Sequence, residues 1–341
     1  MGHEILENGP SSILFTGHPL ANLIARVDPS VIESLNFAKG ESNGITPETF
    51  KKLGERVNVE SIHPGCSSSN SAFAYSYLGG DSSYYGLVGD DEYADLFEER
   101  LSHCGVKNLI IRKRELFTSQ LYSLVTPDAE RTMYLMFGAS HTMKSDDLDE
   151  SIMDNFDYYA VNGFMFADDD QVKLTNKMID AALSRGKGVI TFLANSSCVR
   201  RHGDHLKAAA EKSIYLTGNL EEFRELYGLE EPEKLFTMFE ELTDGEKPQH
   251  KAVIITMGSE GAYVTYHGKR YFVPPCDVEA VDTTGAGDFF AGAFFYGLLN
   301  GYSIKTSSEF AVVTVGDTIS RVGITFSDGL AAKIVDIKAS A

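Results

Sequence analysis

The sequence predicts an α/β fold in which helices cover both faces of a doubly wound, mostly parallel sheet, with a small β-rich lid inserted into it. Three observations lead to this prediction. The chain has 341 residues, 43% of them hydrophobic, which is enough for a substantial core. Short apolar runs alternate with helical segments, as they do in βαβ units. Two stretches interrupt this alternation, and one of them has a strand-turn-strand pattern.

The apolar runs of the alternating part are the predicted strands of the main sheet. In chain order they are Ile13–Thr16, Tyr84–Val88, Tyr158–Val161, Gly188–Leu193, Ser213–Leu216 and Ala252–Thr256. The helical segments between them include Ser69–Leu78, Asp91–His103, Asp169–Arg185 and Leu220–Leu226. Residues 230–249 are charged and polar, so we expect a surface helix and a loop there. A helix between successive strands returns the chain in the same direction, which predicts a mostly parallel sheet.

The two interrupting stretches are the predicted lid. Residues 116–137 contain two expected strands, Thr118–Thr126 and Arg131–Phe137, around the turn composition Pro127-Asp128-Ala129-Glu130. Residues 18–64 contain one expected helix, Thr46–Arg56, in otherwise irregular sequence. We therefore expect residues 1–341 to form one unit, with a large domain of about residues 1–17, 65–115 and 138–341 and a lid of about residues 18–64 and 116–137.

Charge and cysteine content narrow the function classes. The net charge of -19 argues against a nucleic acid or an anionic membrane as partner. The N-terminus lacks the features of a signal peptide, and no run of 18 apolar residues predicts a membrane span. The four cysteines have no CxxC spacing, which favours reduced thiols in a cytoplasmic protein. The sequence leaves a monomer and a homodimer equally open.

The strongest chemical signal is Asp282-Thr283-Thr284-Gly285-Ala286-Gly287-Asp288, followed by the apolar helical run FFAGAFFYGLL. Backbone N–H groups of Gly285, Ala286 and Gly287 at a helix N-terminus are expected to form an anion hole. Asp288 lies in the first helical turn, where a carboxylate can accept a proton from a substrate hydroxyl. This combination suits phosphoryl transfer. The alternative is a tight loop with an ordinary acidic residue at a helix start.

This heptapeptide resembles the second signature of the ribokinase/PfkB family of carbohydrate and nucleoside kinases, and the resemblance extends over nearly the whole chain. It implies the ribokinase-like fold. Segment 124–132 resembles the adenosine kinase branch. The other segments that carry the resemblance are Gly17-His18-Pro19-Leu20-Ala21-Asn22, His63-Pro64-Gly65-Cys66-Ser67-Ser68-Ser69-Asn70, Gly218-Asn219-Leu220-Glu221-Glu222 and Thr256-Met257-Gly258-Ser259-Glu260-Gly261.

The resemblance implies ATP and Mg²⁺ as cofactors and allows a K⁺ ion. Asn219 and Glu222, three residues apart at a helix start, are expected to bind Mg²⁺ through water, although the same spacing fits a helix-capping pair. Arg131 would reach the transferred phosphoryl group when the lid closes; the alternative is a solvated hairpin charge. The remaining implied sites are ATP phosphates at Asn219, Thr256, Gly258 and Gly261, and a monovalent cation at Asp282 and Thr284.

The acceptor substrate is expected at Asn22, Gly65, Cys66, Asn70 and Phe164. Two of these depart from the family pattern. Asn22 stands where the family has Asp, which weakens a charge-assisted grip on substrate hydroxyls. Cys66 stands where the family has a second Gly, so its side chain is expected to narrow or reshape the pocket. Phe137 and Phe164 are candidates for packing against a base or sugar, with core packing as the alternative.

Together these features predict a kinase that transfers the γ-phosphoryl group of ATP to a primary, 5'-type hydroxyl of a ribonucleoside. Adenosine is the leading acceptor because the adenosine kinase branch is the nearest resemblance. Asp288 would be the general base. One alternative is a kinase of ribose, fructose or a related sugar. Another is a catalytically weak, nucleotide-binding regulatory homologue, which the departures at Asn22 and Cys66 motivate.

Overall fold

The computed structural model describes residues 10–35, 39–40, 42–128, 130–323 and 325–341. The expected boundaries that fall on residues 1–9, and Ala129 of the expected turn, lie outside this part of the chain. The main sheet has nine described strands, in the spatial order β14, β13, β12, β11, β10, β9, β1, β5, β6. Their bounds, in chain order, are β1 (Ser12–Thr16), β5 (Asp81–Val88), β6 (Lys107–Arg112), β9 (Tyr158–Asn162), β10 (Gly188–Phe192), β11 (Tyr215–Asn219), β12 (Ala252–Thr256), β13 (Ala262–Tyr266) and β14 (Lys269–Val273).

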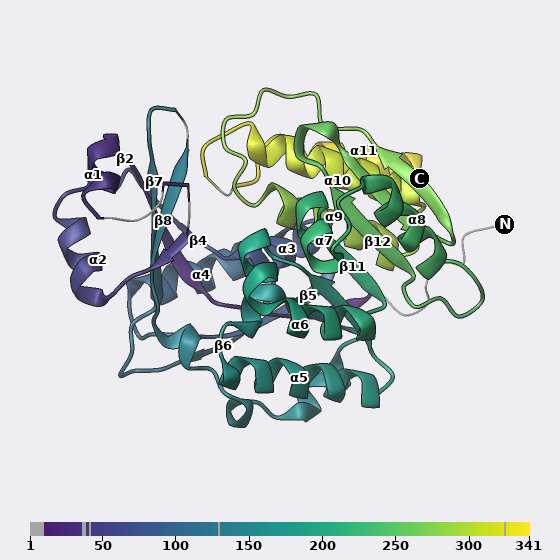
Figure 1. The fold of residues 1–341 in the computed structure, drawn as a ribbon, viewed down its shortest axis with the longest axis horizontal. Helices are drawn as coiled ribbons and strands as arrows, with labels where there is room; N and C mark the ends of the chain where they lie inside the picture. Colours follow the sequence, from purple (N-terminus) through teal and green to yellow (C-terminus); the bar gives the residue numbers. More distant parts are fainter. Residues whose placement is uncertain (1–9, 36–38, 41, 129, 324) are drawn as a thin grey trace.

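The sheet is parallel from β12 to β6, and the β13–β14 hairpin continues it antiparallel at one edge. Helices cover both of its faces, as predicted (Figure 1). One face carries α3 (Ser67–Tyr77), α4 (Glu92–His103), α9 (Ala286–Leu299), α10 (Ile304–Ile319) and α11 (Asp328–Ser340). The other carries α5 (Asp169–Ser184), α6 (Ser196–Lys212), α7 (Leu220–Tyr227) and α8 (Pro232–Leu242).

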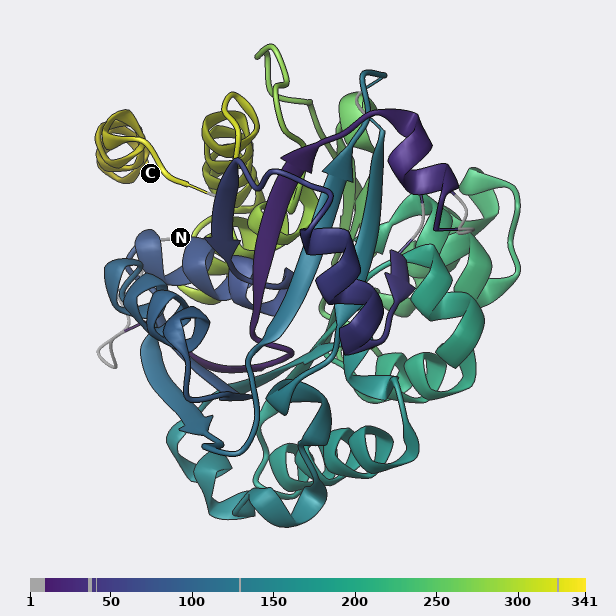
Figure 2. The same ribbon diagram turned by 90° about the vertical axis from the view of Figure 1, so that its left-hand side faces the viewer.

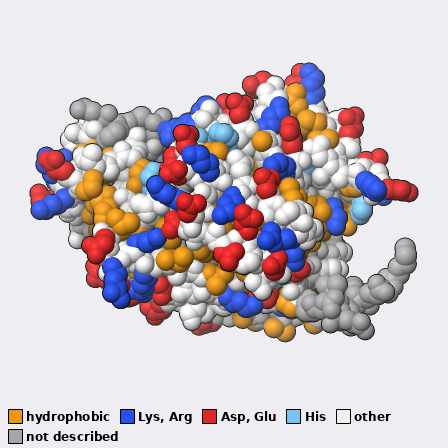
Figure 3. Space-filling model, turned by 90° about the horizontal axis from the view of Figure 1, so that it is seen from below, with side chains coloured by type: hydrophobic (Ala, Val, Ile, Leu, Met, Phe, Trp, Pro, Cys, Tyr) orange, Lys and Arg blue, Asp and Glu red, His pale blue; other side chains and the backbone are white. Residues whose placement is uncertain are grey.

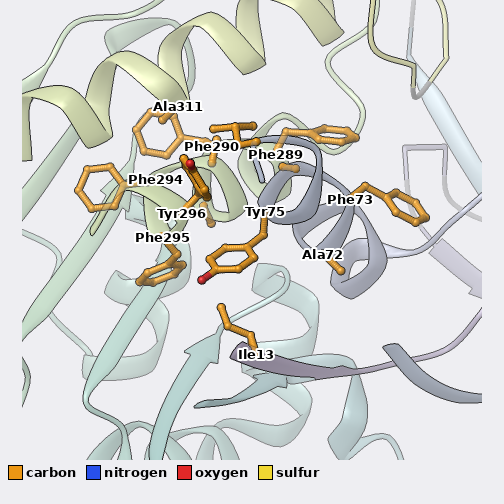
Figure 4. Packing of buried hydrophobic residues seen from close by; sticks show 14 of the residues in the cluster. Ile13, Ala72, Phe73, Tyr75, Phe289, Phe290, Phe294, Phe295, Tyr296 and Ala311 are labelled. Carbon is orange, nitrogen blue, oxygen red and sulfur yellow. The ribbon is translucent and has the colours of Figure 1, made fainter. Parts of the chain in front are cut away.

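Alternation along β1 shows how one strand serves both layers. Ile13 and Phe15 point into the cluster formed with α3 and α9, and Leu14 points into the cluster formed with α5. In Figure 4, Ile13 lies below Tyr75 of α3 and the aromatic rings of α9. Helix α9 is apolar all round because it is buried between the sheet, α3 and α10.

Small residues let α3 and α9 approach each other closely. A Cβ atom added at Gly292 of α9 would lie 2.2 Å from the carbonyl oxygen of Ser71 in α3. A Cβ atom cannot lie so close to a carbonyl oxygen, so the approach of α3 to α9 requires glycine at position 292. The N-terminal ends of both helices are thereby brought together at one edge of the main sheet, and this juxtaposition builds the site described below.

A second sheet, here called the small sheet, has five described strands in the order β3, β8, β7, β2, β4. They are β2 (Leu20–Arg26), β3 (Ser42–Gly44), β4 (Ser61–Pro64), β7 (Ser119–Val125) and β8 (Arg131–Met136). Helices α1 (Pro29–Glu33) and α2 (Pro47–Gly54) pack on its outer face, away from the main sheet (Figure 2). Leu23 and Tyr122 point toward these helices, so Asn22 and Leu121, paired in the register, point to the opposite face.

The expectation that residues 18–64 are irregular around one helix was wrong, because they also supply three strands of the small sheet. The short polar strands β3 and β4 have no apolar alternation that would reveal them. The β13–β14 hairpin, β6, α6, α10 and α11 were also not predicted. Most predicted elements agree with the structure to within two or three residues.

The remaining regular elements are short 3₁₀ helices: η1 (Ala139–Thr142), η2 (Ser145–Asp147), η3 (Glu150–Asn155), η4 (Gly163–Phe166) and η5 (Gly258–Glu260). Acidic and basic side chains are interspersed over the face shown in Figure 3. Over the described ranges, no helix is both long and apolar enough to cross a bilayer.

Candidate active site

A cavity of about 240 Å³ lies where the carboxyl ends of β10, β11 and β12 meet the N-terminus of α9. Ser67 of α3 also lines it. The predicted residues that line it are Asn219, Glu222, Thr256, Gly285, Ala286, Gly287 and Asp288. Gly258 and Gly261 belong to the β12–β13 connection and do not contribute to this lining. Residues from five separate segments of sequence are therefore assembled around one cavity.

Asp288 is held by two side chains of α3. The Ser67 hydroxyl donates to Oδ1 at 2.6 Å, and Asn70 Nδ2 donates to Oδ2 at 3.1 Å. Asn162, at the end of β9, donates in turn to the Ser67 oxygen at 3.0 Å. Burial raises the pKa of Asp288 to about 6, against the lowering effect of the two hydrogen bonds. Ser67 and Asn70 thus hold the two carboxylate oxygens in place. With a pKa of about 6, the carboxyl group is mostly ionised at neutral pH.

The loop before α9 reaches its shape through Gly285. This residue caps the helix with φ of 73°, and an added Cβ would lie 2.8 Å from Asn70 Nδ2. The N–H of Ala286 donates to the Thr283 carbonyl at 3.2 Å, closing the turn. The Ala286 N–H, one of the three expected to form the anion hole, is thus engaged within the loop. Gly285 and Gly287 lie beside it at the helix N-terminus.

Asn219 and Glu222 form the capping box that their spacing allowed. Glu222 Oε2 accepts from the Asn219 N–H at 2.9 Å, and Asn219 Oδ1 accepts from the Glu222 N–H at 2.8 Å. Glu222 is only 4% exposed, and burial raises its pKa to about 7. Both residues line the same cavity as Asp288. A carboxylate already occupied by its cap suits contact with Mg²⁺ through water rather than direct ligation.

Metal binding at this cavity would depend on more than protein side chains. In the described residues there is no group of three His, Cys, Asp or Glu side chains placed to hold a metal. Mg²⁺ commonly binds through few protein ligands, several waters and substrate phosphates. The donor set around Glu222 fits that type of site.

Arg131 contacts Asp282 in this structure. Its Nη2 atom lies 2.6 Å from Asp282 Oδ1, and the Asp282 side chain is only 3% exposed. The same carboxylate accepts from the N–H of Thr284 at 2.9 Å and of Gly323 at 3.1 Å. Burial alone would raise the pKa of Asp282, but these hydrogen bonds and the Arg131 charge hold it below its usual value. The Arg131 guanidinium thus already lies against the carboxylate of Asp282, one of the two residues implied as a K⁺ site.

On the acceptor side, two predicted residues have unused hydrogen-bonding capacity. The side-chain oxygens of Asn22 and Asn70 are buried and have no hydrogen-bond partner in the structure. Asn22 is 6% exposed and points toward the inner face of the small sheet. Gly65 donates its N–H to the Leu20 carbonyl at 3.0 Å, joining the segments that enter and leave the small sheet. A buried acceptor without a donor indicates a place for a ligand hydroxyl or amine.

The side chain of Cys66, expected to narrow or reshape the pocket, points toward Tyr84. Its Sγ atom lies 3.0 Å from the Tyr84 hydroxyl and packs with the main core. Burial raises the pKa of this thiol, so it stays protonated and unreactive. A Cβ at Gly17 would be 3.3 Å from the same sulfur. The side chain is thus directed at β5 and the β1–β2 connection.

Aromatic side chains are exposed at the acceptor side. Phe137 is 43% exposed and Phe164 is 39% exposed, so the alternative that they belong to the core is wrong. The Phe137 ring lies 4.4 Å from the His141 ring, centroid to centroid. His18 contacts the Phe164 carbonyl through Nε2 at 3.2 Å. The His18 and His141 rings lie 6.2 Å apart, centroid to centroid, and so connect the segments of Phe137 and Phe164.

Sequence reasoning missed Ser67 and Asn162 as partners of the Asp288 carboxyl. Ser67 lies inside a motif that was recognised, but nothing local shows that its hydroxyl meets a residue 221 positions away. Asn162 follows a predicted strand, and its position at a carboxyl end was the one available signal.

The family model described as pfkB family carbohydrate kinase matches residues 36–328. The chain belongs to the pfkB family. As a pfkB protein it is a kinase of sugars or nucleosides, a phosphotransferase that uses an alcohol group as acceptor. Two curated relatives illustrate the range of this family. Adenosine kinase 1 of Arabidopsis thaliana is 23% identical over 340 residues, covering 93% of this chain and 96% of its own. Ribokinase of Schizosaccharomyces pombe is 47% identical, but over only 78 residues, or 23% of this chain and 24% of its own.

Solved structures confirm the ribokinase-like fold of this pfkB protein. A probable sugar kinase from Rhizobium etli has a TM-score of 0.86 and 24% identity, covering 96% of this chain and 99% of its own. Adenosine kinase from Sinorhizobium meliloti has a TM-score of 0.84 and 23% identity, covering 98% and 100%. A structure from E. coli named as a Ribokinase II in complex with ATP and Mg²⁺ has a TM-score of 0.76 and 18% identity, covering 96% and 98%.

Proposed function

We propose that this pfkB protein transfers the γ-phosphoryl group of ATP to the 5'-type hydroxyl of a ribonucleoside, with adenosine as the leading acceptor and AMP as its product. The observation that carries the proposal is the Asp288 carboxylate, fixed by Ser67 and Asn70 at the N-terminus of α9 and facing the cavity. A base so placed lies beside the N–H groups that stabilise an anion.

The reaction uses Asp288 as the general base. With its pKa raised to about 6 by burial, the carboxylate is ionised at neutral pH, yet basic enough to accept the proton of an attacking hydroxyl. Ser67 and Asn70 hold its two oxygens in position. The N–H groups of Gly285 and Gly287 stabilise the negative charge on the phosphoryl oxygens. Mg²⁺, when bound with ATP near Asn219 and Glu222, neutralises phosphate charge.

The acceptor side supports a nucleoside over a free sugar. The buried oxygens of Asn22 and Asn70 are suited to accept hydrogen bonds from sugar hydroxyls. A free sugar presents hydroxyls on all sides, whereas this side also carries the exposed Phe137 and Phe164 rings. Leu121 and Leu135, paired across β7 and β8, extend the apolar wall on the inner face of the small sheet. A planar base stacks well on such a surface.

The small sheet is proposed to act as the lid, with the domain boundaries expected from the sequence. Two predicted site residues, Asn22 of β2 and Arg131 of β8, lie on strands of the small sheet and not on the main sheet. Closure over the acceptor would exclude water and so suppress ATP hydrolysis. We further propose a cytoplasmic location, which suits four free thiols, with no nucleic-acid or membrane partner. A monomer and a homodimer remain equally compatible with these features.

A panel of acceptors tests the proposal. Purified protein is incubated with ATP, Mg²⁺ and adenosine, other ribonucleosides, ribose or fructose, and ADP release is followed. We expect the highest kcat/KM with a ribonucleoside. A preference for ribose or fructose would replace the proposal with the sugar kinase alternative. ATP binding without phosphorylation of any acceptor would favour a regulatory homologue.

A further inference from the structure

The ion pair of Arg131 and Asp282 joins the small sheet to the loop that precedes α9. Arg131 begins β8 and pairs with Val125 in the register. Its Nη2 atom is 2.6 Å from Asp282 Oδ1, and the side chains are 25% and 3% exposed. This contact links the small sheet, through Arg131, to the loop before α9, through the nearly buried carboxylate of Asp282. The position of the small sheet is therefore coupled to the shape of that loop.

The Asp282 carboxylate organises two separate segments. It accepts from the N–H of Thr284, one residue before the helix cap Gly285, and from the N–H of Gly323 in the loop after α10. Both oxygens are therefore occupied by backbone donors as well as by the guanidinium. The Asp282 carboxylate carries a negative charge at a nearly buried position. Because an unpaired buried charge is strongly destabilising, a positive charge is needed close by.

Three other titratable groups lie beside this loop. Arg100 lies over the ring of Phe326, with its guanidinium carbon 5.6 Å from the ring centroid. His63 of β4 packs against Gly323, where an added Cβ would lie 2.2 Å from its ring, and burial lowers the pKa of this histidine, keeping it neutral. Arg321 pairs with a different buried carboxylate, that of Asp317, at 3.0 Å. Each of the two buried aspartates, Asp282 and Asp317, thus has its own arginine.

We propose that the Arg131 guanidinium takes the place of a monovalent metal cation at Asp282, so that this kinase turns over without K⁺ or Na⁺. Only the part of this inference that concerns turnover rests on the proposed function; the part that concerns the charge at Asp282 does not. Arg131 is then a positioning residue: it reaches the anion-binding loop through Asp282 and Thr284, not through the phosphoryl group. Removing the guanidinium leaves the buried Asp282 carboxylate beside two backbone donors. K⁺ can then bind there and neutralise the negative charge of the carboxylate.

Turnover in different salts provides the first test. Wild type, Arg131→Ala and Arg131→Lys are assayed in KCl and in tetramethylammonium chloride at equal ionic strength. We expect wild type and Arg131→Lys to vary less than about twofold between salts. Arg131→Ala is expected to lose at least about tenfold in tetramethylammonium chloride and to recover most of that loss in KCl. Arg26→Ala is the matched control: Arg26 lies in the same row of the small sheet and pairs with Glu60 at the surface.

Thermal unfolding provides a second test that needs no substrate and survives failure of the proposed function. We expect K⁺ to raise the Tm of Arg131→Ala by several degrees over tetramethylammonium, and to leave wild type and Arg26→Ala unchanged. A wild-type enzyme that requires K⁺ would overturn the proposal. So would an Arg131→Ala enzyme whose lost turnover and Tm both ignore K⁺, since that result would assign Arg131 to the phosphoryl group or to folding alone.

Discussion

The Ser67 hydroxyl donates a 2.6 Å hydrogen bond to the carboxylate of Asp288, although 221 positions separate the two residues. The bond exists because α3 and α9 pack so closely that Ser71 touches Gly292 one turn further on. It stabilises the ionised form of a carboxyl whose burial favours the protonated form. The close packing of α3 against α9 thereby places a hydrogen-bond donor that favours the ionised form of the proposed base.

Replacement of Ser67 by Ala tests this relationship. Loss of a donor to the charged form raises the pKa of Asp288 further above about 6. We expect the acid limb of kcat/KM against pH to move to higher pH, and turnover at neutral pH to fall by about tenfold. Ser71→Ala is the matched control, since Ser71 donates to the Asp288 carbonyl and not to its carboxylate. An unchanged acid limb in Ser67→Ala would refute the assignment.

Glu222→Gln separates the two roles of Glu222. Glutamine carries no charge and keeps one acceptor oxygen for the Asn219 N–H, but it loses the second oxygen, which accepts from Asn219 Nδ2 at 2.6 Å. The folded pKa of Glu222 is raised to about 7, so its protonated form is favoured, and stability is lost as pH rises from about 4.5 to 7. We expect this loss of up to about 3 kcal/mol to shrink in Glu222→Gln, measured by urea unfolding at pH 5 and 8.

The same variant reports on Mg²⁺. If the Glu222 carboxylate contacts Mg²⁺ through water, the Mg²⁺ concentration for half-maximal turnover should rise several-fold in Glu222→Gln. An unchanged Mg²⁺ dependence would leave Glu222 as a helix cap only. Asp169→Asn is a suitable control, because Asp169 lies in the first turn of α5 and outside the cavity lining.

Asn22→Asp tests the acceptor side. The buried Asn22 oxygen has no partner, and a carboxylate there would make stronger, charge-assisted bonds to a pair of hydroxyls. We expect KM for the preferred nucleoside to fall by about 3–10-fold with kcat little changed. A raised KM would show that the acceptor presents a different pattern of donors at this position.

The sequence predicted what local pattern can encode. Apolar runs located six of the seven described parallel strands, all but β6, and the Asp282–Asp288 motif located the helix start that carries the proposed base. Strands β3 and β4 escaped prediction because they are short and polar, and are stabilised by partners distant in the chain. The direction of the Cys66 thiol depends on Tyr84, and the position of Arg131 depends on Asp282. Such contacts are set by packing, which no local pattern specifies.

Asp288→Asn provides the most direct test of the proposed mechanism. Asparagine keeps the size of the side chain and one acceptor for Ser67, but cannot take a proton from the acceptor hydroxyl. We measure kcat with the preferred acceptor, and ATP affinity by calorimetric titration. The expected result is a loss of about 10²–10⁴-fold in kcat with ATP affinity largely kept. Turnover within a few-fold of wild type would contradict the assignment of Asp288 as general base.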